Sequence, residues 1–237
     1  KYHVVVANPP YMGGKGMNGK LGDYLKANYA DVKSDLFSAF IVRNSYMTLH
    51  KGQMGFLTPF VRMFISSYEK LRLFLLENKT ITSLVQLEYS GFDGATVPIC
   101  TFTLENSHRP NFKGGYVRLS DFRGSVNQGP KTLEAIQNPD CGWFHRACAN
   151  DFEKVPGSPI AYWLSESLIK SFSENSKLAE FCPGSFGMSA GDPSIIHHWH
   201  EASLGRISFG ETSSKAFDLV TPFAPYDKGG EFRRWYG

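Results

Sequence analysis

The stretch Val4-Val5-Val6-Ala7-Asn8-Pro9-Pro10-Tyr11 decides how this sequence is expected to fold. Residues 4–7 form an uninterrupted apolar run of mostly β-branched residues, which is typical of a central parallel strand covered on both faces. Two prolines then stop the strand, because proline fixes φ, lacks an N–H and holds the residue before it extended. The sequence therefore predicts a buried strand that ends in a rigid corner.

Ligands of open α/β sheets gather just beyond the carboxyl ends of strands, where this corner would lie. The Asn8 side-chain oxygen and the Pro9 carbonyl can accept both N–H groups of a planar amine, which draws the nitrogen toward tetrahedral geometry and frees its lone pair. Tyr11 would stack on the ring that carries the amine. The corner therefore suits methylation of a poorly nucleophilic amine, and a DNA base would have to be flipped out of its stack to reach it.

Length and composition bound the other possibilities. The 237 residues suffice for one or two domains, and a hydrophobic fraction of 42% suffices for a core. No apolar run approaches the roughly 18 residues of a membrane span and no signal peptide is present, so we expect a soluble cytoplasmic protein without a membrane partner. The formal charge is only +3, so nucleic-acid binding would depend on local basic patches.

The cysteines and histidines do not form a metal-binding pattern. No Cys-x-x-Cys spacing occurs among Cys100, Cys141, Cys148 and Cys182, which favours reduced thiols over disulfides or zinc. No carboxylate or cysteine stands at a supporting spacing to the run His197-His198-Trp199-His200, so a solvated turn is the favoured interpretation. We therefore expect no metal site.

Strand and helix patterns alternate after the corner. Met12–Lys20 is glycine-rich and is expected to be a mobile loop, in which Lys15 and Lys20 either contact substrate phosphates or belong to a plain connector. Helices are expected to open at the N-cap Ser34, with Gly52 as C-cap, and at a capping box over Ser66–Glu69. The expected strands cover residues 53–58, 81–88, 99–104 and 114–119. This alternation predicts half of a doubly wound α/β sheet.

The corner motif resembles that of the amino-methyltransferases that use S-adenosylmethionine and carry Asn/Asp/Ser-Pro-Pro-aromatic. The resemblance implies a catalytic role for Asn8, Pro9, Pro10 and Tyr11. It also implies the C-terminal half of a Rossmann-like class I methyltransferase sheet, whose last strands form a hairpin with one antiparallel member. A phenylalanine in the hairpin loop of that family packs on the flipped base opposite the tyrosine. Phe92 is the candidate here, and its alternative role is that of a core aromatic which anchors the loop.

Further stretches extend the resemblance over nearly the whole chain. They are Met12–Lys15, Ser34–Phe37, Ser66–Arg72, Pro156–Trp163 and Lys228–Tyr236. In combination they resemble the adenine-specific DNA methyltransferases of the BREX phage-defence system and the related restriction-modification fusions. The resemblance implies S-adenosylmethionine as the cofactor, double-stranded DNA and other phage-defence proteins as partners, and the bacterial cytoplasm as the location.

A domain boundary is expected near Val155, because the polar, proline-punctuated stretch 123–140 interrupts the alternation. Residues 1–155 would form the catalytic domain, and residues 156–237 would begin a mixed α/β target-recognition domain. Its basic residues Lys228, Arg233 and Arg234 are interleaved with aromatic rings. They are expected to contact the DNA backbone, or else to form an edge covered by the remainder of the full-length chain.

The family's Phe/Asp-x-Gly-x-Gly cofactor loop has no counterpart in this sequence. We expect that loop upstream of Lys1 in a longer protein, so that this chain holds only the substrate half of the site. The isolated chain should then bind S-adenosylmethionine poorly and show no turnover.

Two alternatives remain open at the level of sequence. Methylation of a protein glutamine or of a ribosomal RNA amine uses the same motif, although those enzymes generally end soon after the last strand, whereas more than 120 residues follow Leu104 here. A non-catalytic DNA-specificity module could also have kept the fold. Methylation of a cytosine ring carbon is excluded, because that reaction needs a Pro-Cys nucleophile and the sequence contains no Pro-Cys dipeptide.

Overall fold

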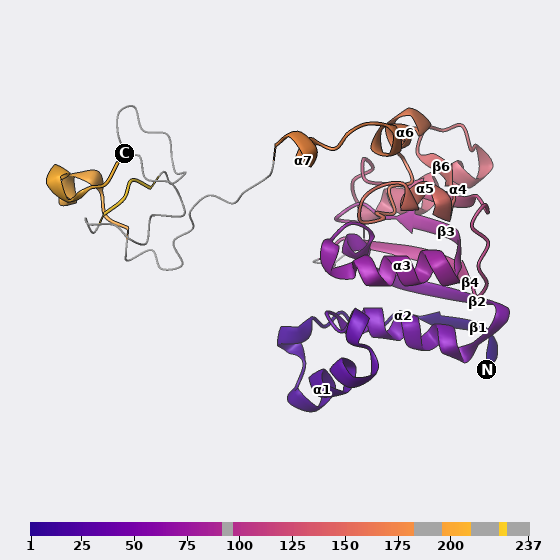
Figure 1. The fold of residues 1–237 in the computed structure, drawn as a ribbon. Coiled ribbons are helices and arrows are strands. Elements are labelled where there is room, and N and C mark those ends of the chain that lie inside the picture. Colours follow the sequence, from indigo (N-terminus) through magenta and orange to yellow (C-terminus); the bar gives the residue numbers. More distant parts are fainter. Residues whose placement is uncertain (92–96, 183–195, 210–222, 227–237) are drawn as a thin grey trace. The chain divides into compact units, whose positions relative to one another are not determined.

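A computed structural model describes the chain except for residues 92–96, 183–195, 210–222 and 227–237 (Figure 1). The residues group into two compact units, Lys1–Ser176 and Lys177–Gly237. The second unit contains the short helix α7 (Leu178–Phe181) and the 3-10 turns η6 (Trp199–Glu201) and η7 (Leu204–Arg206). In the described ranges, no helix has the length and apolar character that crossing a membrane requires.

A six-stranded mixed sheet in the order β1-β2-β4-β3-β5-β6 organises the first unit. The strands are β1 (Tyr2–Ala7), β2 (Thr48–Pro59), β3 (Thr80–Gln86), β4 (Ile99–Glu105), β5 (Gly114–Arg118) and β6 (Phe144–Ala147). β1 runs parallel to β2 and β3 runs parallel to β5, whereas β4 is antiparallel to both β2 and β3. The ends of β1, β2, β3 and β5 therefore meet at one edge of the sheet, which we name the carboxyl edge.

Helices cover the two faces of the sheet unequally. They are α1 (Gly19–Asn28), α2 (Leu36–Met47), α3 (Glu69–Asn78), α4 (Ser125–Gln137), α5 (Ala149–Glu153) and α6 (Glu166–Glu174), with 3-10 turns η1 (Gly14–Gly16), η2 (Ala30–Val32), η3 (Phe60–Met63) and η4 (Ser66–Tyr68). α2 and α3 lie along one face, where Phe37 and Leu71 share a core cluster with Tyr116 of β5 (Figure 1). Val117 belongs instead to a second cluster with Ala135 of α4. Because neighbouring strand residues point to opposite faces, α4 covers the other face.

The first strand is not buried on both faces, so that prediction is wrong for this chain. β1 is an edge strand of the described sheet, and Val4 and Val6 are 61% and 77% exposed. Only the alternate residues Val5 and Ala7 pack against the core. The apolar run still forms a parallel strand, but its second edge and one face have no partner among the described residues.

Both predicted helix starts need correction. α2 begins after Asp35 and not after Ser34, because the Asp35 carboxylate accepts the Phe37 N–H at 3.3 Å. The capping box predicted at Ser66–Glu69 does not form, since η4 occupies residues 66–68 and the N-cap Tyr68 makes no side-chain cap. Gly52 is not a C-cap either, because α2 ends at Met47 and Gly52 lies inside β2.

Helices lie in two stretches for which the sequence predicted none. The expected loop Met12–Lys20 contains η1 and the start of α1, whose N-cap Asn18 accepts the Leu21 N–H at 2.9 Å. The polar stretch after residue 123 contains α4, with Pro130 inside it. Buried Gln128 anchors this helix by accepting the Glu88 N–H at 3.1 Å and donating to the Phe122 carbonyl at 2.6 Å. The tertiary hydrogen bond from Glu88 thus helps to stabilise a helix that its local sequence disfavours.

The compact first unit extends to Ser176, beyond the division predicted at residues 155 and 156. Ile160 and Tyr162 are 1% and 3% exposed and belong to the core cluster under α2 and α3. The Ile160 N–H also donates to the Met63 carbonyl at 3.0 Å. The segment 156–164 is therefore built into the sheet unit, while its role as the start of a target-recognition region stays a prediction.

Candidate active site

The corner motif lies at the carboxyl edge, between the end of β1 and the end of β2. Asn8 is exposed and Pro9 is buried. The Tyr11 hydroxyl lies 3.3 Å from Asn8 Oδ1 and 3.3 Å from the Leu57 carbonyl oxygen of β2. One O–H proton is shared between these two acceptors, so both bonds are weak and three-centred. The phenol thereby joins the motif to the neighbouring strand while Asn8 stays open to solvent.

The ring of Tyr11 is supported by an aromatic cluster of α2 and η4. It meets buried Phe37 edge-on at 6.4 Å, and Phe37 stacks on Tyr68 at 5.5 Å. Burial, with a smaller contribution from nearby Cys100, raises the pKa of the Tyr11 phenol, so the hydroxyl remains a donor at neutral pH. With 38% of Tyr11 exposed, the site presents a fixed aromatic surface beside an open carboxamide. A planar ring with an amino group fits such a surface.

Asp35 holds the residues that follow the motif against the start of α2. Its Oδ1 accepts the N–H groups of Met12 at 3.1 Å and Phe37 at 3.3 Å, and the Leu36 N–H donates to the Met12 carbonyl at 3.0 Å. Burial raises the pKa of Asp35, although backbone N–H donors oppose this shift. The path of the chain after Tyr11 is therefore set by the same helix that seats the tyrosine ring.

Arg62 stabilises the end of β2 from inside the protein. It is 1% exposed, and its Nη1 donates to Thr58 Oγ1 at 3.1 Å, to the Pro59 carbonyl at 3.3 Å and to Cys100 Sγ at 2.9 Å. Its guanidinium carbon lies 3.9 Å from the centre of the Phe102 ring, which offsets part of the desolvation of the cation. The carbonyl that binds the Tyr11 hydroxyl thus belongs to a strand end that is held firmly.

The structure brings only some of the predicted site residues together. Asn8, Pro9, Pro10 and Tyr11 meet at the carboxyl edge, and Lys15 and Lys20 are exposed on η1 and α1, the next elements of the chain. The other predicted residues, Phe92, Lys228, Arg233 and Arg234, lie outside the described residues. Sequence reasoning missed Asp35 and Arg62, and the available signals were an Asp before an apolar helix and an Arg just after a strand-ending Thr-Pro.

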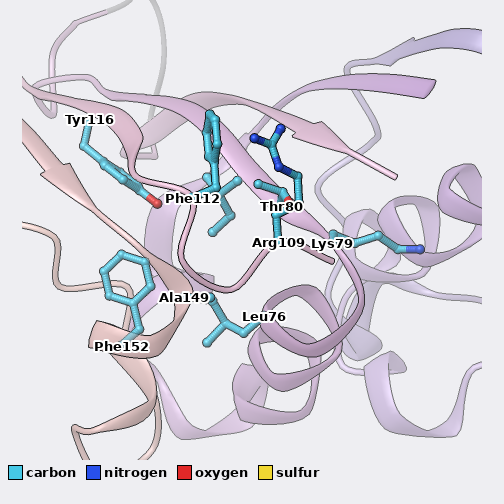
Figure 2. Close-up of a pocket in the computed structure, with 9 residues that line it drawn as sticks. Leu76, Lys79, Thr80, Arg109, Phe112, Tyr116, Ala149 and Phe152 are labelled. Atoms are coloured by element: carbon cyan, nitrogen blue, oxygen red, sulfur yellow. The ribbon is translucent and has the colours of Figure 1, made fainter. Parts of the chain in front are cut away.

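A cavity of about 10 Å³ lies at the opposite edge of the sheet, between the start of β3 and α5 (Figure 2). Its lining includes Leu76, Thr80, Tyr116 and Phe152. A volume of this size holds about one water molecule, so it is a packing gap and not a substrate site. The chemistry of the motif is at the other end of the strands.

The strand order β1-β2-β4-β3, with only β4 antiparallel and the motif directly after β1, is that of the C-terminal half of a class I methyltransferase sheet. This fold class was predicted from the sequence and is confirmed. Residues 1–92 match the family model of the Eco57I restriction-modification methylase. The chain is also similar to named proteins over its whole length, as the motifs predicted.

The chain is 34% identical over 242 residues to the adenine-specific methyltransferase PglX of Lacticaseibacillus casei (strain Zhang). It is 35% identical over 241 residues to the adenine-specific methyltransferase BrxX of Escherichia coli O9:H4 (strain HS). Both alignments cover 100% of this chain but only 20% and 19% of the relatives, so the chain spans about a fifth of their length. Among solved structures, the methyltransferase subunit of a type I restriction-modification system from Streptococcus thermophilus has a TM-score of 0.51 at 18% identity, with 67% of this chain and 37% of that chain covered.

Proposed function

We propose that the chain is the substrate-side part of a site-specific DNA methyltransferase of phage defence or restriction-modification. It would transfer a methyl group from S-adenosylmethionine to the exocyclic amine of a flipped adenine. The observation that carries the proposal is the exposed Asn8 at the carboxyl end of β1, beside the partly exposed ring of Tyr11. The similarity of the whole chain to PglX and BrxX, which are both named adenine-specific methyltransferases, supports it.

The proposed chemistry follows from two acceptor oxygens and one ring. The adenine amine donates its two N–H groups to Asn8 Oδ1 and to the Pro9 carbonyl, and the purine stacks on Tyr11. The Tyr11 hydroxyl occupies one lone pair of Asn8 Oδ1, and the second lone pair remains for the amine. As the nitrogen gains the methyl group its positive charge grows, and the two oxygens stabilise that charge until a proton is lost. The bound S-adenosylmethionine supplies the electrophilic methyl group.

The cofactor site is proposed to lie in another part of a longer protein. The free edge of β1 is a suitable place for a further parallel strand, because a strand edge presents unpaired N–H and C=O groups. The exposed side chains of Val4 and Val6 show that one face of β1 is uncovered as well. Glycine-rich phosphate or ribose loops characteristically follow such strands. An added strand would bring its carboxyl end next to Asn8.

DNA is the proposed macromolecular partner, and several residues would contact it. Lys15 and Lys20 are exposed and follow directly after the motif, so they suit phosphate contacts beside the target base. Phe92 is proposed as the second stacking ring. Lys228, Arg233 and Arg234 are proposed as contacts of a target-recognition region that begins after residue 155, within a bacterial cytoplasmic enzyme.

The test is the substitution Asn8→Ala in the full-length protein that contains this chain. Loss of an acceptor that binds the reacting group lowers the rate by roughly 100- to 1,000-fold, and adenine methylation should fall by at least that factor while DNA binding persists. Methyl transfer is measured with radiolabelled S-adenosylmethionine on genomic DNA from a strain that lacks the enzyme. Asn127→Ala, at an exposed position of α4, is the matched control and should methylate normally. Unchanged methylation by Asn8→Ala would remove Asn8 from the mechanism.

A further inference from the structure

Arg118 is an unused cation at the carboxyl edge. It is the last residue of β5, and its side chain has no hydrogen-bond acceptor or acidic partner among the residues that the structure describes. Its Nε is buried without a partner, and its guanidinium carbon lies 4.9 Å from the centre of the Trp163 ring. A guanidinium offers five N–H donors in a fixed plane, and leaving them unused in a half-buried place costs free energy. The Arg118 guanidinium is therefore suited to donate hydrogen bonds to an acceptor on a ligand.

Trp163, whose ring lies under this guanidinium, belongs to the segment 156–164, and hydrogen bonds fix this segment. Arg72 donates to the Gly157 carbonyl at 2.7 and 3.1 Å, and the Tyr162 hydroxyl donates to Gln86 Oε1 at 2.8 Å. Trp163 itself is half-buried and packs against Phe64 at 5.5 Å. The ring therefore does not have to be ordered when a ligand binds, which lowers the entropic cost of binding.

The charge around Arg118 is not neutralised. The neighbouring His145 has its pKa lowered first by burial and then by the positive charge of Arg118. None of the ion pairs among the described residues includes Arg118. A positive, partly desolvated site with a planar donor set favours an anion with several oxygens, and the phosphate of a nucleic-acid backbone is such an anion.

The position of Arg118 relative to the motif fits a nucleic-acid strand. Both lie at the carboxyl edge, and four strand spacings of roughly 4.8 Å place β5 about 19 Å from β1. This separation is about the length of five to six base pairs at 3.4 Å each. Arg118 also points to the face on which α2 seats Tyr11, because it shares that face with Tyr116. A duplex whose target base reaches Asn8 would extend past Arg118.

We propose that Arg118, whose guanidinium lies over the Trp163 ring, binds a backbone phosphate of the DNA about five to six base pairs from the flipped adenine. This inference rests on the proposed function, and it adds a DNA contact within the sheet unit itself. The guanidinium N–H groups donate to the phosphate oxygens, while the indole face supports the cation from the other side. The contact fixes the register of the duplex and carries no sequence information.

The test is the salt dependence of DNA binding by the full-length protein with Arg118→Gln. Each phosphate contact contributes about 0.9 to the slope of log K against log salt, so the affinity loss between 50 and 200 mM salt should be about 3.5-fold smaller in the variant than in the wild type. Arg118→Lys keeps the charge and should restore the wild-type slope. Arg146→Gln, an exposed arginine of β6 that donates to the Lys113 carbonyl at 3.0 Å, is the matched control and should leave the slope unchanged.

An unchanged slope in Arg118→Gln overturns the inference while leaving the proposed methyltransferase intact, because methylation by the wild type is measured separately. Failure of the wild type to methylate or bind DNA overturns the proposed function instead, and the inference with it. A measurement on the wild type covers the case in which the variant does not fold. Phenylglyoxal should modify Arg118 less when duplex DNA is bound, with Arg146 unaffected, and equal modification of Arg118 with and without DNA contradicts the contact.

Discussion

Arg72 should control how firmly the segment 156–164 is held at the carboxyl edge. It is 1% exposed, and its guanidinium makes four hydrogen bonds to three carbonyl oxygens, those of Arg62, Ile65 and Gly157. The substitution Arg72→Met fills a similar volume but donates nothing. All three carbonyls would then lose a charged donor in the protein interior.

The expected cost follows from these three acceptors. A buried acceptor left without a donor costs roughly 1–3 kcal/mol. Burial also lowers the pKa of Arg72, which shows that the protein interior disfavours the cation, so removing the cation offsets part of the cost of the three unpaired carbonyls. We expect a net loss of about 3 kcal/mol in the free energy of local opening, which corresponds to a roughly 100-fold faster exchange of the affected amides. Arg72→Lys retains one donor group, so its free energy of local opening should lie between those of the wild type and Arg72→Met.

Hydrogen exchange measured by mass spectrometry tests this expectation, and it can be applied to the full-length protein. The peptide around Ile160 should exchange roughly 100-fold faster in Arg72→Met, because the Ile160 N–H bond to Met63 depends on the clamped segment. Arg43→Met replaces an exposed arginine within α2 and should change exchange little. Wild-type exchange at Ile160 in Arg72→Met would refute the reasoning, since the three carbonyls would then not depend on this side chain.

Three further outcomes follow from single contacts. Burial raises the pKa of Asp35 above its usual 3.8, so folding favours the protonated acid. The wild type should therefore lose stability relative to Asp35→Asn as the pH rises through the raised pKa, and denaturation midpoints measured across this pH range test it. Gly52→Ala would place a Cβ 2.7 Å from Thr48 Cγ2 and should cost about 1–3 kcal/mol in guanidinium unfolding, whereas Gly22→Ala has nothing within 4 Å and should not destabilise. Tyr11→Ala should weaken adenine stacking by roughly 1–3 kcal/mol in 2-aminopurine fluorescence, while Tyr11→Phe keeps the ring and should bind nearly normally.

The parallel strands could be predicted because their signals are local, whereas their order in the sheet was not predicted. Apolar runs, a proline stop and the helices between strands indicate a doubly wound sheet, and the position of the motif after the first strand follows directly. The edge position of β1 could not be read from the sequence. Val4-Val5-Val6-Ala7 has the composition of a central strand, and its exposure depends on which other strands are present.

Helix α4 was missed because a long-range bond helps to stabilise it. Its sequence is polar and contains Pro130, and these features favour a loop when only neighbouring residues are considered. One of the hydrogen bonds that fix the helix is long-range, because Gln128 Oε1 accepts the N–H of Glu88, two residues beyond β3. The other two run from Gln128 Nε2 to the carbonyls of Phe122 and Gly124 in the preceding turn. No local pattern encodes the bond to Glu88.

The candidate site was predicted in part, for a similar reason. Asn8 and Tyr11 are neighbours in the sequence, so a motif reveals them together. Arg62 lies in η3 just after β2, and Arg118 is the last residue of β5, so these arginines come from separate parts of the chain. A preceding Thr-Pro was the signal available for Arg62, and no local pattern marked Arg118. The segment 156–164 was assigned to a second domain because it follows the polar, proline-punctuated stretch 123–140 and resembles a target-recognition region. The burial of Ile160 and Tyr162 in the core could not be read from that pattern, and the division into domains stays a prediction.

The central claim is that an adenine donates its exocyclic hydrogens to the two oxygens of the corner after β1. A structure of the full-length protein with its DNA site and sinefungin, a non-reactive analogue of the cofactor, measures this directly. The account predicts a flipped adenine stacked on Tyr11, with its amino nitrogen about 2.8–3.2 Å from both Asn8 Oδ1 and the Pro9 carbonyl oxygen. An adenine that enters the site but leaves either oxygen beyond hydrogen-bond distance, or a target base that remains in the duplex, would contradict it.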